Sequence, residues 1–182
     1  MKFIKNKIEK AYKNNMLVCI CLNSIVWNNR IIGYVVNMNA SDKFDLEIID
    51  EFGQKKNIKT IPFSAVKCLE IGGEYNEDIE KLYKEGFVKN QSKPHYIFAK
   101  KQRLYTKLVE LKDKKTLCSF IFKSEYSIGI VEEITQKELV IKNIGYNGVS
   151  DGISVYDVSL LTEIRYNSNF ENRISFLYMK KG

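Results

Sequence analysis

The sequence predicts an α+β chain, mainly β, made of two tandem copies of one five-stranded β-barrel unit, each led and closed by a helix. Three observations predict it: apolar positions that recur at a nearly fixed offset, short segments in which apolar residues alternate, and turn residues between them. The chain has 182 residues, 45% of them hydrophobic, which is enough to bury two small cores. We place the two units at residues 1–86 and 87–182.

The repeat is clearest in the helix that is expected to close each unit. Four apolar positions on one helical face recur 95 residues later. They are Tyr75, Ile79, Leu82 and Tyr83 in the first unit and Phe170, Ile174, Leu177 and Tyr178 in the second. The strand before the helix repeats at the same offset. This ordered series indicates a duplication.

A basic amphipathic helix is expected to lead each unit. Ile8 and Tyr12 match Leu104 and Leu108 at an offset of 96. Pro94 is expected to open the second of these helices, because its fixed φ and missing N–H suit the first turn of a helix.

Five strands are expected to follow each leading helix, with Gly33 and Gly129 at corresponding places in the second strand. The expected strands include residues 17–26, 44–49, 58–61 and 66–71 in the first unit and 117–122, 138–144, 153–156 and 160–165 in the second. Turns are expected at Asn28-Asn29, Phe52-Gly53, Ser124-Glu125 and from Asn147-Gly148 to Asp151-Gly152. Because no long crossover separates the strands, they suit a small antiparallel sheet that closes on itself.

This order of elements resembles the Sm-like (SH3-like barrel) superfamily. The resemblance is carried by the leading helix, by Gly33 in the second strand, and by the run Asp42-Lys43-Phe44-Asp45-Leu46-Glu47-Ile48 in the third. The second copy has Gln136-Lys137-Glu138-Leu139-Val140-Ile141. The units are also similar to small single-barrel proteins of low-GC bacteria. The resemblance implies the fold.

RNA recognition of the Sm type is not implied by the same residues. Sm proteins that bind RNA carry an asparagine after the aromatic residue of the third strand, where this sequence has Asp45. They also carry a basic residue followed by glycine in a later loop, where this sequence has Ile61-Pro62-Phe63. The resemblance therefore gives little support to RNA binding.

The net charge of +7 is concentrated in two segments, with +4 in residues 1–13 and +8 in residues 86–123. The candidate contacts for an anion or a nucleic acid are Lys93, Lys100, Lys101, Arg103, Lys107, Lys114 and Lys115. Tyr96 and Tyr105 lie among them and offer rings on which bases stack. The alternative is a solvated helix face that complements the acidic barrels. Both interpretations stay open.

No residue pattern points to catalysis, a cofactor or a metal. The only histidine, His95, has no carboxylate near it in the sequence and is expected to be a helix-entry residue. The four cysteines, Cys19, Cys21, Cys68 and Cys118, are expected to be buried structural thiols, because zinc sites need about four Cys or His ligands in paired spacings. Trp27, at an expected hairpin tip, is either an interface anchor or a cap on the barrel end. Tyr96 and Tyr105 are the other candidate interface residues.

These observations predict a cytoplasmic, non-catalytic binding protein with no membrane partner, since no apolar run approaches the ~20 residues of a membrane span and no signal peptide is visible. We expect it to act through protein–protein interaction, as an accessory, immunity or defence-related factor of a bacterium or its mobile element. The alternative is an RNA- or nucleic-acid-binding regulator that uses the basic connector helix. Association of identical chains through open barrel edges is also left open.

Overall fold

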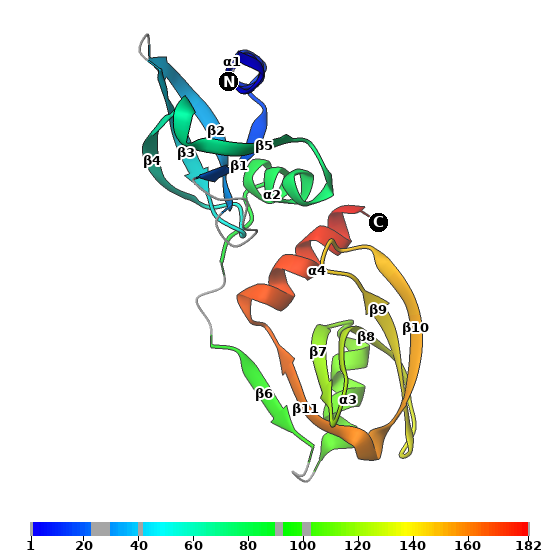
Figure 1. Cartoon of the computed structure of the whole chain (residues 1–182). Coiled ribbons are helices and arrows are strands. Elements are labelled where there is room, and N and C mark those ends of the chain that lie inside the picture. The colour runs from blue at the N-terminus through cyan, green and yellow to red at the C-terminus, as the bar shows by residue number, and fades with distance from the viewer. Residues whose placement is uncertain (1, 23–29, 40–41, 90–92, 100–102, 182) are drawn as a thin grey trace. The chain divides into compact units, whose positions relative to one another are not determined.

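A computed structural model of the chain describes residues 2–22, 30–39, 42–89, 93–99 and 103–181 (Figure 1). The chain divides into two compact units, Met1–Val88 and Lys89–Gly182. Each unit has its own antiparallel sheet with helices packed against it, so the prediction of an α+β chain is confirmed. Among the described residues, no helix is long and apolar enough to cross a membrane.

The first unit is a five-stranded sheet between two helices. Its elements are α1 (Lys2–Lys13), β1 (Leu17–Leu22), β2 (Arg30–Asn39), β3 (Lys43–Ile49), β4 (Lys55–Pro62), the 3-10 turn η2 (Phe63–Ala65), β5 (Val66–Ile71) and α2 (Glu74–Lys84). The strands are ordered β4-β3-β2-β1-β5. Trp27 and the expected turn at Asn28-Asn29 lie outside the described residues.

The second unit is a six-stranded sheet with the same order of shared strands. Its elements are β6 (His95–Phe98), α3 (Leu104–Asp113), β7 (Leu117–Phe122), β8 (Tyr126–Ile134), β9 (Glu138–Ile144), β10 (Ser150–Asp157), the 3-10 turn η3 (Val158–Leu160), β11 (Leu161–Tyr166) and α4 (Asn169–Lys181). The strands are ordered β10-β9-β8-β7-β11-β6. Within the described residues neither order returns to its first strand, so the expected closure of each sheet is not present.

Strand β6 has no counterpart in the predicted unit, and the prediction that Pro94 opens the second helix is wrong. The residues after Pro94 form a strand antiparallel to β11, and α3 begins only at Leu104. The run His95-Tyr96-Ile97-Phe98 has the aromatic and β-branched residues that favour a strand. A proline just before an edge strand removes no hydrogen bond of the sheet.

The leading helices match at an offset of 100, and the predicted offset of 96 is wrong. Ile8 and Leu108 are the corresponding buried residues. Two residues after the end of each helix stands a left-handed residue, Asn15 at φ 49° or Lys115 at φ 48°. A slip of four residues keeps the same helical face, so apolar spacing does not distinguish the two alignments.

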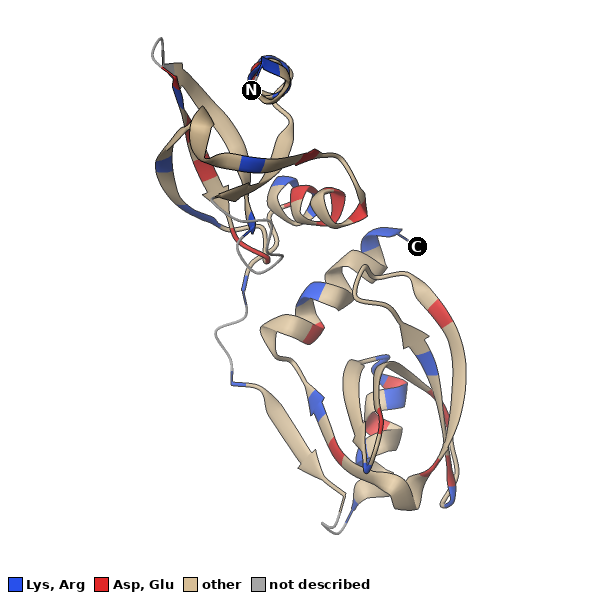
Figure 2. Cartoon of the chain, viewed as in Figure 1, with Lys and Arg blue, Asp and Glu red and all other residues tan. Residues whose placement is uncertain are grey.

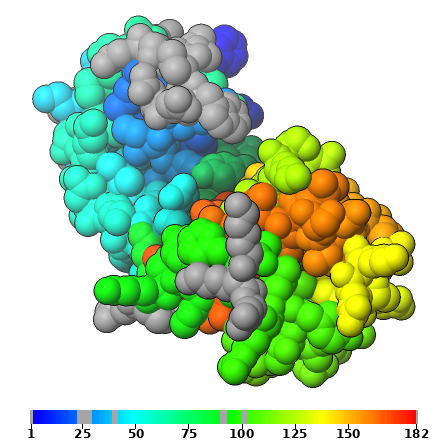
Figure 3. All heavy atoms as spheres, turned by 90° about the horizontal axis from the view of Figure 1, so that it is seen from below, coloured from blue at the N-terminus to red at the C-terminus, as the bar shows by residue number. Residues whose placement is uncertain are grey.

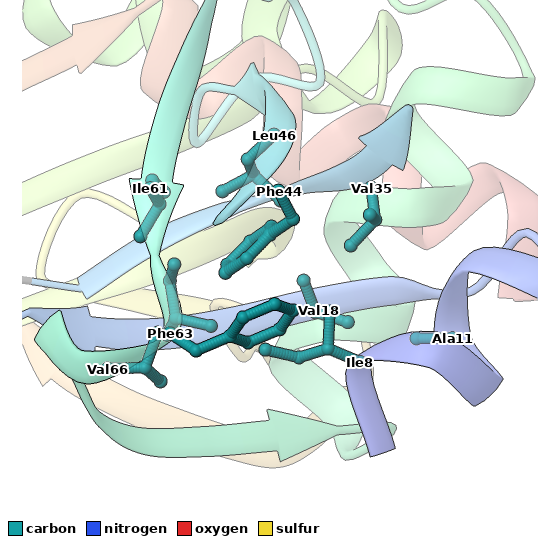
Figure 4. Close-up of a cluster of buried hydrophobic side chains, with 10 residues drawn as sticks. Ile8, Ala11, Val18, Val35, Phe44, Leu46, Ile61, Phe63 and Val66 are labelled. Atoms are coloured by element: carbon teal, nitrogen blue, oxygen red, sulfur yellow. The ribbon is translucent and has the colours of Figure 1, made fainter. Parts of the chain in front are cut away.

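One core in each unit lies between the sheet and its leading helix. In the first unit, Ile8 and Ala11 of α1 contact the cluster around Phe44 and Phe63, whose ring centroids are 5.1 Å apart (Figure 4). In the second unit, Leu108 of α3 occupies the corresponding position. Burial of these side chains is the main force that holds each helix on its sheet.

Each closing helix packs against a turn that contains a glycine. This turn lies between β3 and β4 in the first unit and between β9 and β10 in the second. A Cβ on Gly53 would lie 2.7 Å from the Cβ of Leu82, and a Cβ on Gly148 would lie 2.6 Å from that of Leu177. Both glycines have positive φ, which other residues rarely adopt. The second turn is shorter than predicted, because Gly152 lies inside β10 at a shift in strand register.

Candidate binding surfaces

The predicted basic helix is divided between a strand and a shorter helix. Lys93 precedes β6, and Arg103 stands exposed at the N-terminal end of α3 with φ 85°. Lys114 and Lys115 follow the other end, about 15 Å away for a helix of this length. Lys100 and Lys101 lie outside the described residues. The described basic residues therefore do not form one continuous helical stripe.

One of these basic residues is already engaged within the unit. Lys107 Nζ lies 2.6 Å from Glu110 Oε2. This hydrogen bond raises the pKa of Lys107 and lowers that of Glu110. Lys107 also interacts with Tyr166 of β11. Its charge is thus partly neutralised before any ligand binds.

The two candidate stacking residues lie on different elements of this region. Tyr96 is on β6 and Tyr105 is in the first turn of α3, and both side chains are half-exposed. His95 stacks on Tyr166 with ring centroids 5.0 Å apart and planes inclined by 14°. The expectation that His95 enters a helix is therefore wrong, because it pairs within the sheet.

Apolar side chains are exposed on the end strands β10 and β4. Ile153 and Val155 are 63% and 62% exposed. They are two residues apart, so they share one face of β10. Ile58, 95 residues before Ile153, is 59% exposed at the corresponding place on β4. Their exposure could not be predicted from the sequence, because an alternating apolar pattern is the same whether the apolar face of the strand is buried or exposed.

The first unit has a hollow of about 380 Å³ between α1 and β5. We call it the α1–β5 groove. Its floor includes Leu69 and Ile71 of β5, and Met16 also lines it. Lys7 and Lys10 of α1 supply two exposed positive charges on its helical side. Figure 2 shows lysines along α1, in contrast to the acidic residues of α2.

A buried ionic cluster joins α4 to the sheet of the second unit. Glu171, 1% exposed, accepts hydrogen bonds from Ser119 Oγ at 2.5 Å, from Arg165 Nε at 3.1 Å and from Ser168. Burial raises the pKa of Glu171, but these hydrogen bonds outweigh it and leave the pKa below its ordinary value. Local sequence patterns do not reveal this cluster, because Ser119 and Glu171 are 52 positions apart.

The first unit has an ion pair that also involves the strand before its closing helix. Arg30 Nη1 lies 2.5 Å from Glu70 Oε2, and the thiol of Cys19 is beside the guanidinium. In each unit one member of the charged group lies on the strand that precedes the closing helix. This residue is Glu70 on β5 and Arg165 on β11. These groups pair with one another and thereby link neighbouring elements within each unit.

Comparison with known proteins gave no relative. No protein-family model matches the chain, and neither the curated proteins nor the solved structures gave a match.

Three of the four thiols are buried, as predicted, and the fourth is only half-buried. Cys19, Cys21 and Cys118 are buried, whereas Cys68, opposite Cys21 on β5, is only half-buried. Burial raises the pKa of the three buried thiols, so little of the nucleophilic thiolate forms at neutral pH. Among the described residues, no three His, Cys, Asp or Glu side chains are arranged to hold a metal ion.

Proposed function

We propose that this chain is a cytoplasmic, non-catalytic binding protein that acts through protein–protein interaction. The observation that carries the proposal is the exposure of Ile153 and Val155 side by side on β10, which is an end strand among the described residues, and this exposure is repeated at Ile58 of β4. Single exposed apolar residues are common on protein surfaces. Apolar residues on an unpaired strand edge are less common, because such an edge readily takes up another chain.

We also propose that the two units are copies of an Sm-like, SH3-like barrel. Support comes from their shared strand order and from corresponding glycine contacts. A Cβ on Gly33 would lie 2.1 Å from the carbonyl oxygen of Glu47, and a Cβ on Gly129 would lie 2.1 Å from that of Lys142. Two strands approach equally closely at equivalent places in both units.

The buried ionisable groups support a binding role over catalysis. Glu171 is hydrogen-bonded to three side chains of its own unit, and burial keeps the thiol of Cys118 protonated. An acid, base or nucleophile needs a reachable atom in the right protonation state. These groups instead hold the unit together, and we extend the proposal to an accessory or defence-related role.

Affinity capture of the full chain from its native host tests the proposal. We expect one protein to co-purify in a fixed molar ratio. Ile153→Glu and Ile58→Glu place the same charge at corresponding exposed positions, so each is the matched control for the other. One of them should lower recovery of the partner about tenfold, as loss of an apolar interface anchor does. Recovery of RNA alone, or equal recovery with both variants, would contradict the proposal.

A second candidate function is nucleic-acid binding at the junction of β6 and α3. It is favoured by the half-exposed rings of Tyr96 and Tyr105 together with the exposed guanidinium of Arg103. Aromatic rings with a nearby positive charge are the usual elements of a single-strand binding site. An electrophoretic shift with single-stranded RNA should weaken steeply as salt rises. No shift at low ionic strength would rule the candidate out.

A further inference from the structure

The second unit pairs one edge of its sheet with a strand of its own chain, whereas the described residues of the first unit supply no strand at the corresponding edge. Strand β11 pairs with β7 on one side and with β6 on the other. The corresponding strand β5 pairs with β1, and no described strand pairs with its second edge. Figure 3 shows the green residues of this part of the chain on the surface of the second unit, next to orange residues from nearer the C-terminus.

The effect of the added strand is visible in the exposure of the neighbouring residues. Ile164 of β11 is 0% exposed, and Ile97 of β6 packs against the same core. Leu69, 95 residues before Ile164, is only partly buried. It lines the α1–β5 groove, on the side where β6 lies in the second unit.

We propose that the α1–β5 groove binds an extended segment of a partner protein, which adds to β5 as an antiparallel strand. The partner segment takes the place that β6 occupies on β11. One aliphatic or aromatic side chain enters the groove beside Leu69, at the place where Ile97 lies opposite Ile164 in the second unit. Backbone hydrogen bonds to the edge supply affinity, and the inserted side chain supplies selectivity. This inference rests on the proposed function, because it names the kind of protein that is bound.

The charges on the groove indicate an acidic partner. In the second unit, Lys107 is paired with Glu110. At the offset of 100 these positions correspond to Lys7 and Lys10, so the first unit has two lysines where the second has a lysine and a glutamate. A segment with Asp or Glu beside its apolar residue complements both lysines.

The same charges favour a foreign segment over β6 of a second copy. The residues that flank β6 in the sequence are basic: Lys93 on one side, Lys100 and Lys101 on the other. Insertion of this segment beside Lys7 and Lys10 would bring like charges together, which opposes binding.

A labelled peptide tests the groove on the full chain. The probe has the residue order of His95–Ala99, which already fits such an edge, flanked by glutamates. We expect fluorescence anisotropy to show saturable binding that K7E/K10E weakens about tenfold, as loss of two charge pairs predicts. K2E/K13E is the matched control: both lysines are exposed on the same helix, neither lines the groove, and the change in charge is identical. This variant should bind the probe within about twofold of the native chain.

Three further peptides, one lysine-flanked and two N-methylated, separate strand addition from simple charge attraction. A lysine-flanked version should bind at least about tenfold more weakly. Alternate residues of a strand direct their backbone N–H groups to the same edge, so N-methylation of every second residue blocks one edge of the peptide. Two such peptides block one edge each. We expect one of them to lose binding and the other to keep it. Equal weakening by both patterns, equal effects of K7E/K10E and K2E/K13E, or no binding of the glutamate-flanked probe would overturn the inference.

Failure of this inference is distinguishable from failure of the proposed function. If a stoichiometric protein partner remains bound to K7E/K10E as tightly as to the native chain, the groove is not its site, although the binding function stands. Light scattering of the full chain covers the remaining case. A dimer that K7E/K10E stabilises would assign the groove to β6 of a second copy and overturn the acidic partner.

Discussion

Glu171 is a buried charge between α4 and the sheet of the second unit, and its neighbours make it stable there. Its carboxylate would be costly to bury alone, yet Ser119, Ser168 and Arg165 direct hydrogen bonds at it from two strands and from the start of its own helix. The resulting cluster connects α4 with β7 and β11. Removing the charge leaves Arg165 without its carboxylate partner in a partly buried place.

We therefore expect Glu171→Gln to lower the free energy of unfolding by about 3 kcal/mol at neutral pH. Because the folded pKa of Glu171 lies below its ordinary value, the stabilisation is complete above that value and is lost as the pH falls through the folded pKa. Urea unfolding at pH 7 and near pH 3 measures the difference. The gap between variant and native chain should shrink in acid, and a gap of constant size would contradict the assignment. Glu132→Gln, at an exposed position, is the control.

At the scale of elements, each closing helix depends on a glycine that lets two backbones meet. Gly148 has φ 75°, and a Cβ there would lie 2.6 Å from backbone atoms of Leu177 and Tyr178. Gly152 has a similar φ of 82°, but a Cβ there would meet nothing within 4 Å. The two positions separate the cost of an unusual backbone angle from the cost of displacing α4.

Gly152→Ala should lower the free energy of unfolding by about 1 kcal/mol, the usual cost of a left-handed alanine. Gly148→Ala should cost about 3 kcal/mol, because the steric conflict with the helix backbone adds to it. Thermal and urea unfolding of the two variants give both values. Equal losses for the two variants would show that α4 moves away from Gly148 at no cost in free energy, and this would contradict the close packing of the β9–β10 turn against α4.

At the scale of the whole molecule, the chain has two compact units with separate sheets and cores. Each unit buries its own leading helix and closing helix. We expect residues 1–88 and 89–182, expressed separately, to unfold cooperatively in urea, because each retains every strand of its sheet. Circular dichroism and the sharpness of each transition are the measurements. A fragment without a cooperative transition would show that its core is incomplete alone.

Features that depend on local patterns and on their repetition were predictable from the amino-acid sequence. The faces of α2 and α4 followed from apolar positions 95 residues apart, and the glycine turns followed from the preference of glycine for positive φ. The strand content and order in the chain followed from alternation and turns. Exposed Ile58 and Ile153 were not recognised, because alternation does not say which face of a strand is covered.

Contacts between segments that are distant in the sequence followed from packing and strand pairing, which local patterns do not specify. Spacing alone allowed the leading helices to match at 96 or at 100, and packing selected 100. Ser119 and Glu171 were brought together by strands that are distant in sequence, and the segment after Pro94 became a strand because the edge of β11 was available to pair with it. A short segment with weak local preference takes the conformation in which its backbone donors and acceptors find partners. For the same reason, the edge of β5 that no described strand pairs with was recognised only because β6 pairs with the corresponding edge of β11.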